Sequence, residues 1–187
     1  MRSLKLNLII FVSLCFMLAC GKDEESSDCE GHTMSGTFKG ASWEMESITN
    51  ASIFKGTDPT TSKMGYRLDI VAKGKDGSTL SIIVNEFEKG IRGDCMDVTK
   101  TWSTQFYENY YDTIDFSVEI AIFTYVDKAG NGFTTLAEEL DGRFNLTSCD
   151  ETNHKISGTF TFAIKDEESN EVTFSNGKFN NICFTAR

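Results

Sequence analysis

An aromatic-rich segment over residues 102–111 contains the side chains best suited to contact a ligand. Trp102 begins it, and Phe106, Tyr107, Tyr110 and Tyr111 follow, interleaved with Gln, Glu and Asn. Aromatic faces beside amide and carboxylate groups suit stacking on sugars and the recognition of other small ligands. The same composition is also typical of a strand with aromatic residues on both faces. The segment therefore predicts either a ligand-binding surface or part of a core.

Acidic side chains offer a second kind of chemistry, which is hydrolysis by paired carboxylates. They gather in two clusters, at Glu138, Glu139 and Asp141 and at Asp166, Glu167 and Glu168. A glycosidase needs only two carboxyl groups at the right separation, although carboxylates in predicted turns are normally solvated. The two histidines, His32 and His154, fall in polar segments, and no Gly-x-Ser-x-Gly nucleophile motif is present. We therefore predict a non-catalytic protein, with a glycan- or peptide-directed hydrolase as the alternative.

Metal and cofactor motifs are weak in this chain. The loop Asp127–Phe133 has oxygen ligands but lacks the spaced acids of a calcium-binding EF-hand. No Cys-x-x-Cys pair indicates zinc or redox chemistry. We predict no metal and no cofactor other than a covalent lipid.

That lipid is predicted from the N-terminus, which has the composition of a secretory signal. Arg2 and Lys5 precede an apolar run over residues 6–19, which is shorter than the ~20 residues of a membrane-spanning helix and fits a signal peptide. The segment Met17–Gly21 then resembles a lipobox, the cleavage motif of bacterial lipoproteins. There a small residue, here Ala19, precedes a cysteine, here Cys20, whose thiol receives acyl chains such as palmitate.

The lipobox resemblance implies removal of residues 1–19 and a stable anchor on Cys20, because several acyl chains bury enough CH₂ groups. Met17 and Leu18 depart from the usual pattern of a leucine followed by a small residue. An ordinary secretory signal is the alternative. Residues 20–33 would form a tether in front of one folded domain over residues 34–187.

Two short motifs resemble sequences of exported Bacteroidota proteins. Directly behind the proposed anchor, the run Lys22, Asp23, Glu24 and Glu25 is similar to the export signal of their surface lipoproteins. It implies an outer-membrane protein that faces the cell exterior, with the periplasmic face as the alternative. A solvated linker would have the same composition. Asp112-Thr113-Ile114 resembles their O-glycosylation motif, with Thr113 as the acceptor.

Net charge limits the partners. The precursor carries −10, and removal of residues 1–19, which contain two basic and no acidic residues, makes this −12. An acidic protein repels nucleic acid phosphates and anionic lipid headgroups, so we expect no nucleic acid partner and contact with the membrane through the anchor alone. Acidity also simply maintains solubility.

Four cysteines, Cys29, Cys95, Cys149 and Cys183, remain in the predicted domain and tether. An even number in an exported chain indicates up to two disulfides. Cys95 and Cys149 fall in predicted loops, where a bridge is easiest to form. Cys183 lies in an apolar strand and could equally be a buried thiol.

Alternating apolar and polar residues predict β-strands through almost all of the domain. Tyr66, Leu68, Ile70 and Ala72 alternate with polar residues, as expected of a half-buried strand. The Asp76-Gly77 pair then predicts a hairpin turn in which both residues have positive φ. Similar patterns continue to Phe184. Short strands separated by turns predict an antiparallel β-sandwich or barrel built from hairpins.

Several of these strands resemble a family of small Bacteroidota lipoproteins that is catalogued as a domain of unknown function. The resemblance lies in the segments 142–147 and 156–162, the ending Asn176–Phe184, and Thr37–Trp43, which looks like the opening hairpin. Gly40-Ala41-Ser42 departs from the Gly-Lys pair that is commoner there. The resemblance implies an all-β surface or periplasmic lipoprotein and transfers no active site. We expect a module that binds a glycan, peptide or protein, or a structural part of an envelope assembly.

Overall fold

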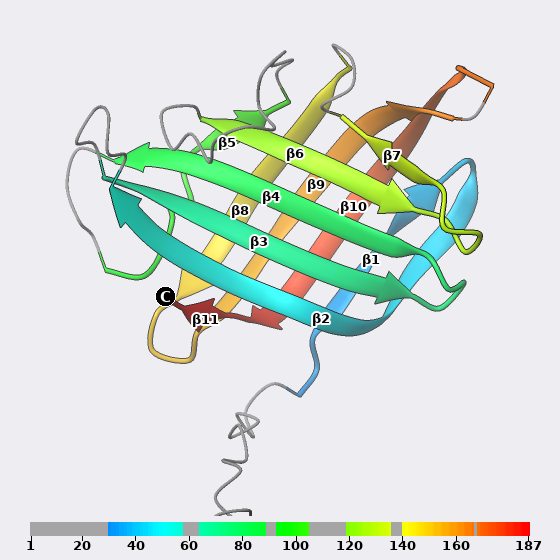
Figure 1. Cartoon of the computed structure of the whole chain (residues 1–187). Coiled ribbons are helices and arrows are strands. Elements are labelled where there is room, and N and C mark those ends of the chain that lie inside the picture. Colours follow the sequence, from blue (N-terminus) through cyan, green and yellow to red (C-terminus); the bar gives the residue numbers. More distant parts are fainter. Residues whose placement is uncertain (1–29, 58–63, 89–92, 105–118, 136–139, 167) are drawn as a thin grey trace, which may run out of the picture. The chain divides into compact units, whose positions relative to one another are not determined.

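The computed structural model describes residues 30–57, 64–88, 93–104, 119–135, 140–166 and 168–187 (Figure 1). The chain divides into two compact units, residues 1–30 and 31–187. All strands below belong to the second unit, which we call the β domain. Within the described ranges, no helix is long and apolar enough to cross a membrane.

In the described residues, eleven strands form one large sheet, which confirms the all-β prediction. They are β1 Thr33–Phe38, β2 Ala41–Thr57, β3 Met64–Gly74, β4 Thr79–Glu88, β5 Thr101–Ser103, β6 Ile120–Val126, β7 Gly132–Thr134, β8 Gly142–Asp150, β9 Lys155–Lys165, β10 Glu171–Cys183 and β11 Thr185–Ala186. Their order is β5-β8-β9-β10-β1-β2-β3-β4-β6-β7, all antiparallel, and the sheet does not close into a barrel. The short β11 pairs in parallel with β2.

The sheet folds over on itself into two layers. Strands β5, β8, β9, β10 and β1 form one layer, and β2, β3, β4, β6 and β7 form the other, with the strands of the two layers crossing steeply (Figure 1). The long strand β2 makes the corner. Its start pairs with β1, its remainder pairs with β3, and its register with β3 shifts twice between Met45 and Asn50. Such bulges bend a strand and let it pass from one layer to the next.

The core lies between the layers and is rich in phenylalanine. On β3, Leu68, Ile70 and Ala72 are fully buried, as their alternation predicts. Across the layers, Phe123 of β6 stacks on Phe162 of β9 with ring centroids 4.6 Å apart. Each fully buried side chain of this kind contributes roughly 1.5–3 kcal/mol through the hydrophobic effect. The core therefore holds the hairpins that extend beyond it.

Three of these hairpins share one loop geometry. The three loops are residues 74–78, 127–131 and 166–170. In each, the backbone N–H of the first residue donates to the carbonyl of the fifth, and the carbonyl of the first accepts from the N–H of the fourth. This is a three-residue loop with a bulge, in which the fourth residue (Gly77, Gly130 or Ser169) has a positive φ. The prediction of a two-residue Asp76-Gly77 turn was wrong in this detail, because Gly77 alone has a positive φ, of 86°. The two-residue turn with two positive φ values is at Lys39-Gly40, between β1 and β2.

Candidate ligand-binding cleft

A cleft with a volume of about 550 Å³ opens between the tips of three hairpins, β1–β2, β6–β7 and β9–β10. Half of its lining is apolar: Phe38, Tyr125, Phe133, Ile164 and Val172. The other half is charged or polar: Lys39, Asp127, Asn131, Asp166 and Glu168. We call the first set the base and the second set the rim. An apolar base with a polar rim is the usual make-up of a small-ligand site.

The base is fixed by packing against the core. The ring of Phe38 lies 4.2 Å from that of Tyr125, centroid to centroid. Tyr125 is almost completely buried, and this burial raises the pKa of its hydroxyl. Beside it, the indole nitrogen of Trp43 donates to the Ser78 hydroxyl over 2.8 Å, and this hydroxyl donates to Asp76 over 2.6 Å. Aromatic rings held in this way form a rigid surface for a ligand.

The first rim loop, residues 127–131, is organised by its own aspartate. Oδ1 of Asp127 accepts from the backbone N–H groups of Ala129 at 2.8 Å and Asn131 at 3.0 Å. Its Oδ2 accepts from the Asn131 side-chain amide at 3.1 Å. The bond from the Asn131 backbone N–H is the largest of several effects that lower the pKa of Asp127. The carboxylate therefore stays ionised well into the acidic range.

The second rim loop, residues 166–170, repeats this pattern. Oδ1 of Asp166 accepts from the backbone N–H groups of Glu168 at 3.1 Å and Asn170 at 3.0 Å. Its Oδ2 accepts from Lys39 at 3.2 Å. Burial by itself would raise the pKa of Asp166, but the bonds from Asn170 and Lys39 outweigh it and lower the pKa. Two equivalent Asp-x-x-x-Asn loops thus face the cleft from different layers.

The predicted aromatic site lies elsewhere. Trp102, on β5, is 2% exposed and packs against Phe144, with ring centroids 5.9 Å apart. It is a core residue, so of the two predictions for this segment Trp102 fits part of a core and not a ligand-binding surface. Among the described residues, its indole nitrogen has no hydrogen-bond acceptor. The other residues of this prediction, Phe106, Tyr107, Tyr110 and Tyr111, and the predicted glycosylation site Thr113, lie outside the described residues.

The described residues of the two predicted acidic clusters lie in different parts of the chain's structure. Asp166 and Glu168 line the cleft, whereas Asp141 is exposed away from it. Glu138, Glu139 and Glu167 lie outside the described residues. In the described part of the chain, no group of three or more His, Cys, Asp or Glu side chains is arranged to hold a metal ion.

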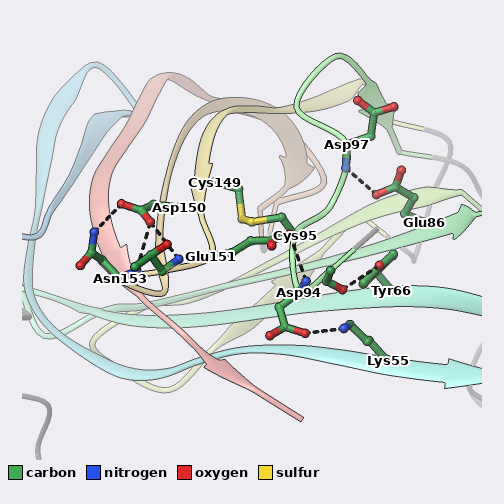
Figure 2. The surroundings of a disulfide bond; sticks show 12 residues. Lys55, Tyr66, Glu86, Asp94, Cys95, Asp97, Cys149, Asp150, Glu151 and Asn153 are labelled. Atoms are coloured by element: carbon green, nitrogen blue, oxygen red, sulfur yellow. Dashed lines mark hydrogen bonds and ion pairs between the residues drawn. A yellow bond between two sulfur atoms is a disulfide. The ribbon is translucent and has the colours of Figure 1, made fainter. Parts of the chain in front are cut away.

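At the end of the β domain opposite the cleft, a disulfide joins Cys95 and Cys149, whose Cα atoms are 5.8 Å apart (Figure 2). This confirms a bridge between Cys95 and Cys149, although Cys149 lies in β8 and not in a loop as predicted. Cys183 is also disulfide-bonded, so it is not the free thiol of the alternative. Cys29 lies outside the described residues, as do Ala19, Cys20 and the run Lys22, Asp23, Glu24 and Glu25.

Hydrogen bonds and ion pairs surround this bridge and link it to both layers. Lys55 pairs with Asp94, whose backbone N–H donates to Glu151 over 3.1 Å (Figure 2). The Asp97 backbone N–H donates to the buried Glu86 carboxylate over 3.0 Å, and Lys100 approaches the same carboxylate at 3.0 Å. Burial raises the pKa of Glu86. These groups satisfy one another, so this end offers structural support.

Sequence reasoning missed the cleft because its base comes from separate hairpins. Phe38, Phe133 and Val172 lie far apart in the sequence and belong to three different strands or their ends. One signal could have found the rim. The spacing Asp-x-x-x-Asn occurs at 127–131 and again at 166–170, each time between two strands. Two such turns of equal length predict equivalent loops.

The chain is an all-β domain of one folded-over sheet with a cleft at one end. A family model matches residues 44–183, and the chain belongs to that family, which is described as a domain of unknown function (DUF6252). The match begins after the Thr37–Trp43 hairpin, so that part of the predicted resemblance lies outside it. No curated protein and no solved structure matches the chain.

Proposed function

We propose that this protein is a non-catalytic binding module whose ligand occupies the cleft between the hairpin tips. The observation that carries the proposal is the combination of a rigid aromatic base with two equivalent rim loops. The volume of about 550 Å³ lies within the roughly 300–1,000 Å³ of small-ligand pockets. Loops that are already ordered lose little conformational entropy when a ligand binds. A glycan, a peptide or a side chain of a partner protein is the expected class of ligand.

Hydrolysis by paired carboxylates is the second candidate, since Asp127, Asp166 and Glu168 meet in one cleft. A glycosidase requires one carboxyl group with a raised pKa, which acts as the general acid. Backbone hydrogen bonds lower the pKa of both Asp127 and Asp166. Oδ1 of each also accepts from two backbone N–H groups that hold its loop. These features favour binding over catalysis.

We further propose that Cys20 is lipidated after removal of residues 1–19 and that the run Lys22–Glu25 directs the protein to the outer face of the outer membrane. The sequence motifs support this. The position of the cleft is compatible with it, because the chain enters the β domain at Thr33 and the cleft lies at the other end of β1, at Phe38. A ligand in the cleft would then bind away from the attachment point.

Filling the cleft tests the binding proposal. Val172 lines the cleft and is half-buried, so Val172→Trp should occupy part of its volume without entering the core. Val98 is 44% exposed and does not line the cleft, so Val98→Trp adds the same bulk elsewhere. The full chain, purified in detergent, is applied to glycan and peptide arrays. We expect Val172→Trp to lose the bound ligands and Val98→Trp to keep them, whereas equal binding by both variants would refute the proposal.

Metabolic labelling with a palmitate analogue tests the anchor, and Cys20→Ser should abolish the label. Protease treatment of intact cells tests the orientation. Replacement of Lys22, Asp23, Glu24 and Glu25 by alanine should protect the domain from the protease if the run is an export signal. Unchanged digestion of that variant would contradict the proposed role of the run.

A further inference from the structure

The cleft carries an excess of negative charge. Its rim has three carboxylates, on Asp127, Asp166 and Glu168, and one cation, Lys39. Lys39 pairs with Asp166. Among the residues that the structure describes, Asp127 and Glu168 form no salt bridge. A ligand that covers them removes water from two uncompensated charges, which is unfavourable unless the ligand carries positive charge.

Donor side chains in and next to the rim each donate one hydrogen bond to a carboxylate of the rim. The side-chain amide of Asn131 donates to Asp127, and that of Asn170 donates to Glu168 over 3.2 Å. Lys39 donates to Asp166. The carboxylates keep acceptor capacity, because each oxygen accepts about two hydrogen bonds, whereas among the described residues Asp127 accepts three and Glu168 one. A sugar hydroxyl can donate to these oxygens but does not neutralise their charge, whereas an ammonium group brings both donors and a positive charge.

The base of the cleft matches the other part of such a ligand. Phe38, Phe133 and Val172 present apolar surface directly beside the rim. An alkyl chain can pack on this surface, and the faces of aromatic rings attract a cation. We propose that the cleft binds an organic ammonium group on an alkyl stem, of the kind that a lysine side chain of a peptide carries. This deepens, and rests on, the proposal that the cleft is the ligand site.

Three small probes separate this ligand class from the others. N-acetyl-lysine methylamide carries the ammonium and its stem, N-acetyl-norleucine methylamide carries a matching stem without the charge, and methyl glucoside represents a sugar. Titrations of the full chain in detergent are followed by NMR on the backbone amides of Gly130 and Ser169. We expect the lysine probe to bind roughly 3- to 30-fold more tightly than the norleucine probe. The difference should shrink at high salt, because ions screen the carboxylates.

Charge-neutralising variants assign the effect to the rim. Asp127→Asn combined with Glu168→Gln removes both uncompensated charges, while an oxygen at position 127 can still accept from the backbone. The matched control is Asp150→Asn, because Asp150 organises a similar loop at the far end of β9, with bonds to the N–H groups of Thr152 and Asn153. The double variant should bind both amino acid probes equally, and the control should behave as the wild type. Glu168→Gln alone should lose part of the preference for the lysine probe over the norleucine probe. This single variant keeps the test decisive if the double variant does not fold.

The outcomes distinguish the two proposals. Equal binding of the lysine and norleucine probes to the wild type, or tighter binding of the sugar, would overturn the ammonium assignment and leave the cleft as a ligand site. A lysine preference that persists in a folded double variant would also overturn it. Array binding that survives Val172→Trp would refute the ligand site itself.

Discussion

The two ends of the β domain are held in order by different kinds of interaction. At the cleft end, each rim loop is closed by its own backbone and its own aspartate, and among the described residues the Lys39–Asp166 salt bridge crosses between loops. At the disulfide end, the bonds run between elements, as in the Cys95–Cys149 bridge and the Lys55–Asp94 pair. Loops that are rigid by themselves leave the space between them open. Loops that are linked to one another close it.

This difference suggests a division of roles. The disulfide end contributes to the stability of the fold, because its links join segments that are distant in sequence. The cleft end contributes a shaped and charged space. A change at one end should therefore affect either stability or binding, but not both equally. The following predictions test this separation, beginning with the largest effect.

Removal of the bridge should cause the largest loss of stability. The Cys95→Ser, Cys149→Ser double variant opens a link between residues 54 positions apart, which in the chain-entropy model stabilises the fold by about 4 kcal/mol. Urea unfolding should show a loss of about 3–4 kcal/mol. Affinity for the lysine probe should remain within twofold of the wild type, on the order of the error of such titrations. A folded double variant that no longer binds the probe would show that the two ends are coupled.

Loss of Lys100 should have the next largest effect, because it removes the salt bridge that the buried Glu86 carboxylate forms within the described residues. The hydrogen bond from the Asp97 backbone N–H would remain. Lys100→Met should cost about 1–3 kcal/mol near neutral pH. Lys75→Met is the control, since Lys75 and Glu44 form a mostly exposed pair, which contributes roughly 0–1 kcal/mol. Urea unfolding of both variants checks the difference.

The pH dependence of Lys100→Met follows from the raised pKa of Glu86. A carboxyl group whose pKa is raised by folding destabilises the fold once it ionises. This penalty develops as the pH rises from the ordinary pKa of 4.5 through the higher pKa of the folded state. Without Lys100 this penalty grows, so the variant should lose more stability at neutral pH than in acid, where Glu86 is protonated. A loss that does not depend on pH would exclude Glu86 as its cause.

Much of the fold could be predicted from local patterns, whereas the cleft could not. Alternation reveals a strand such as β3 because one face of it is buried and the other is not. It does not reveal that β1 pairs with β10 at the other end of the domain sequence. The base of the cleft depends on such long-range pairing, which brings Phe38, Phe133 and Val172 together. The sequence also leaves Trp102 open between a core and a binding surface, since a large aromatic residue suits both equally well.

The two equivalent rim loops offer a smaller test, because the same backbone position is occupied by Gly130 in one and by Ser169 in the other. Their φ angles are 92° and 64°, in the region that disfavours residues with a Cβ atom by about 1–2 kcal/mol. A Cβ at position 130 would meet no neighbouring atom, so Gly130→Ala should cost about 1 kcal/mol through the backbone alone. Ser169→Gly should gain less than this, because glycine adds entropy to the unfolded chain. Thermal unfolding that ranks the two variants in the reverse order would contradict equivalence of the loops.

The smallest effects on stability should come from the loop aspartates, and they compare the two ends most directly. Hydrogen bonds lower the pKa of Asp127 at the cleft end, chiefly from the backbone N–H of Asn131, and of Asp150 at the disulfide end, chiefly from the side chain of Asn153. A carboxyl group whose pKa is lowered by folding stabilises the fold at any pH above its ordinary pKa of 3.8. This contribution disappears as the pH falls through the lower pKa of the folded state. Asp127→Asn and Asp150→Asn should therefore each lower the thermal midpoint slightly at neutral pH and leave it unchanged in strong acid. Only Asp127→Asn should also weaken binding of the lysine probe, because only Asp127 faces the cleft. If Asp150→Asn weakened that binding as much, the negative charge of the whole domain, rather than the rim, would attract the ligand.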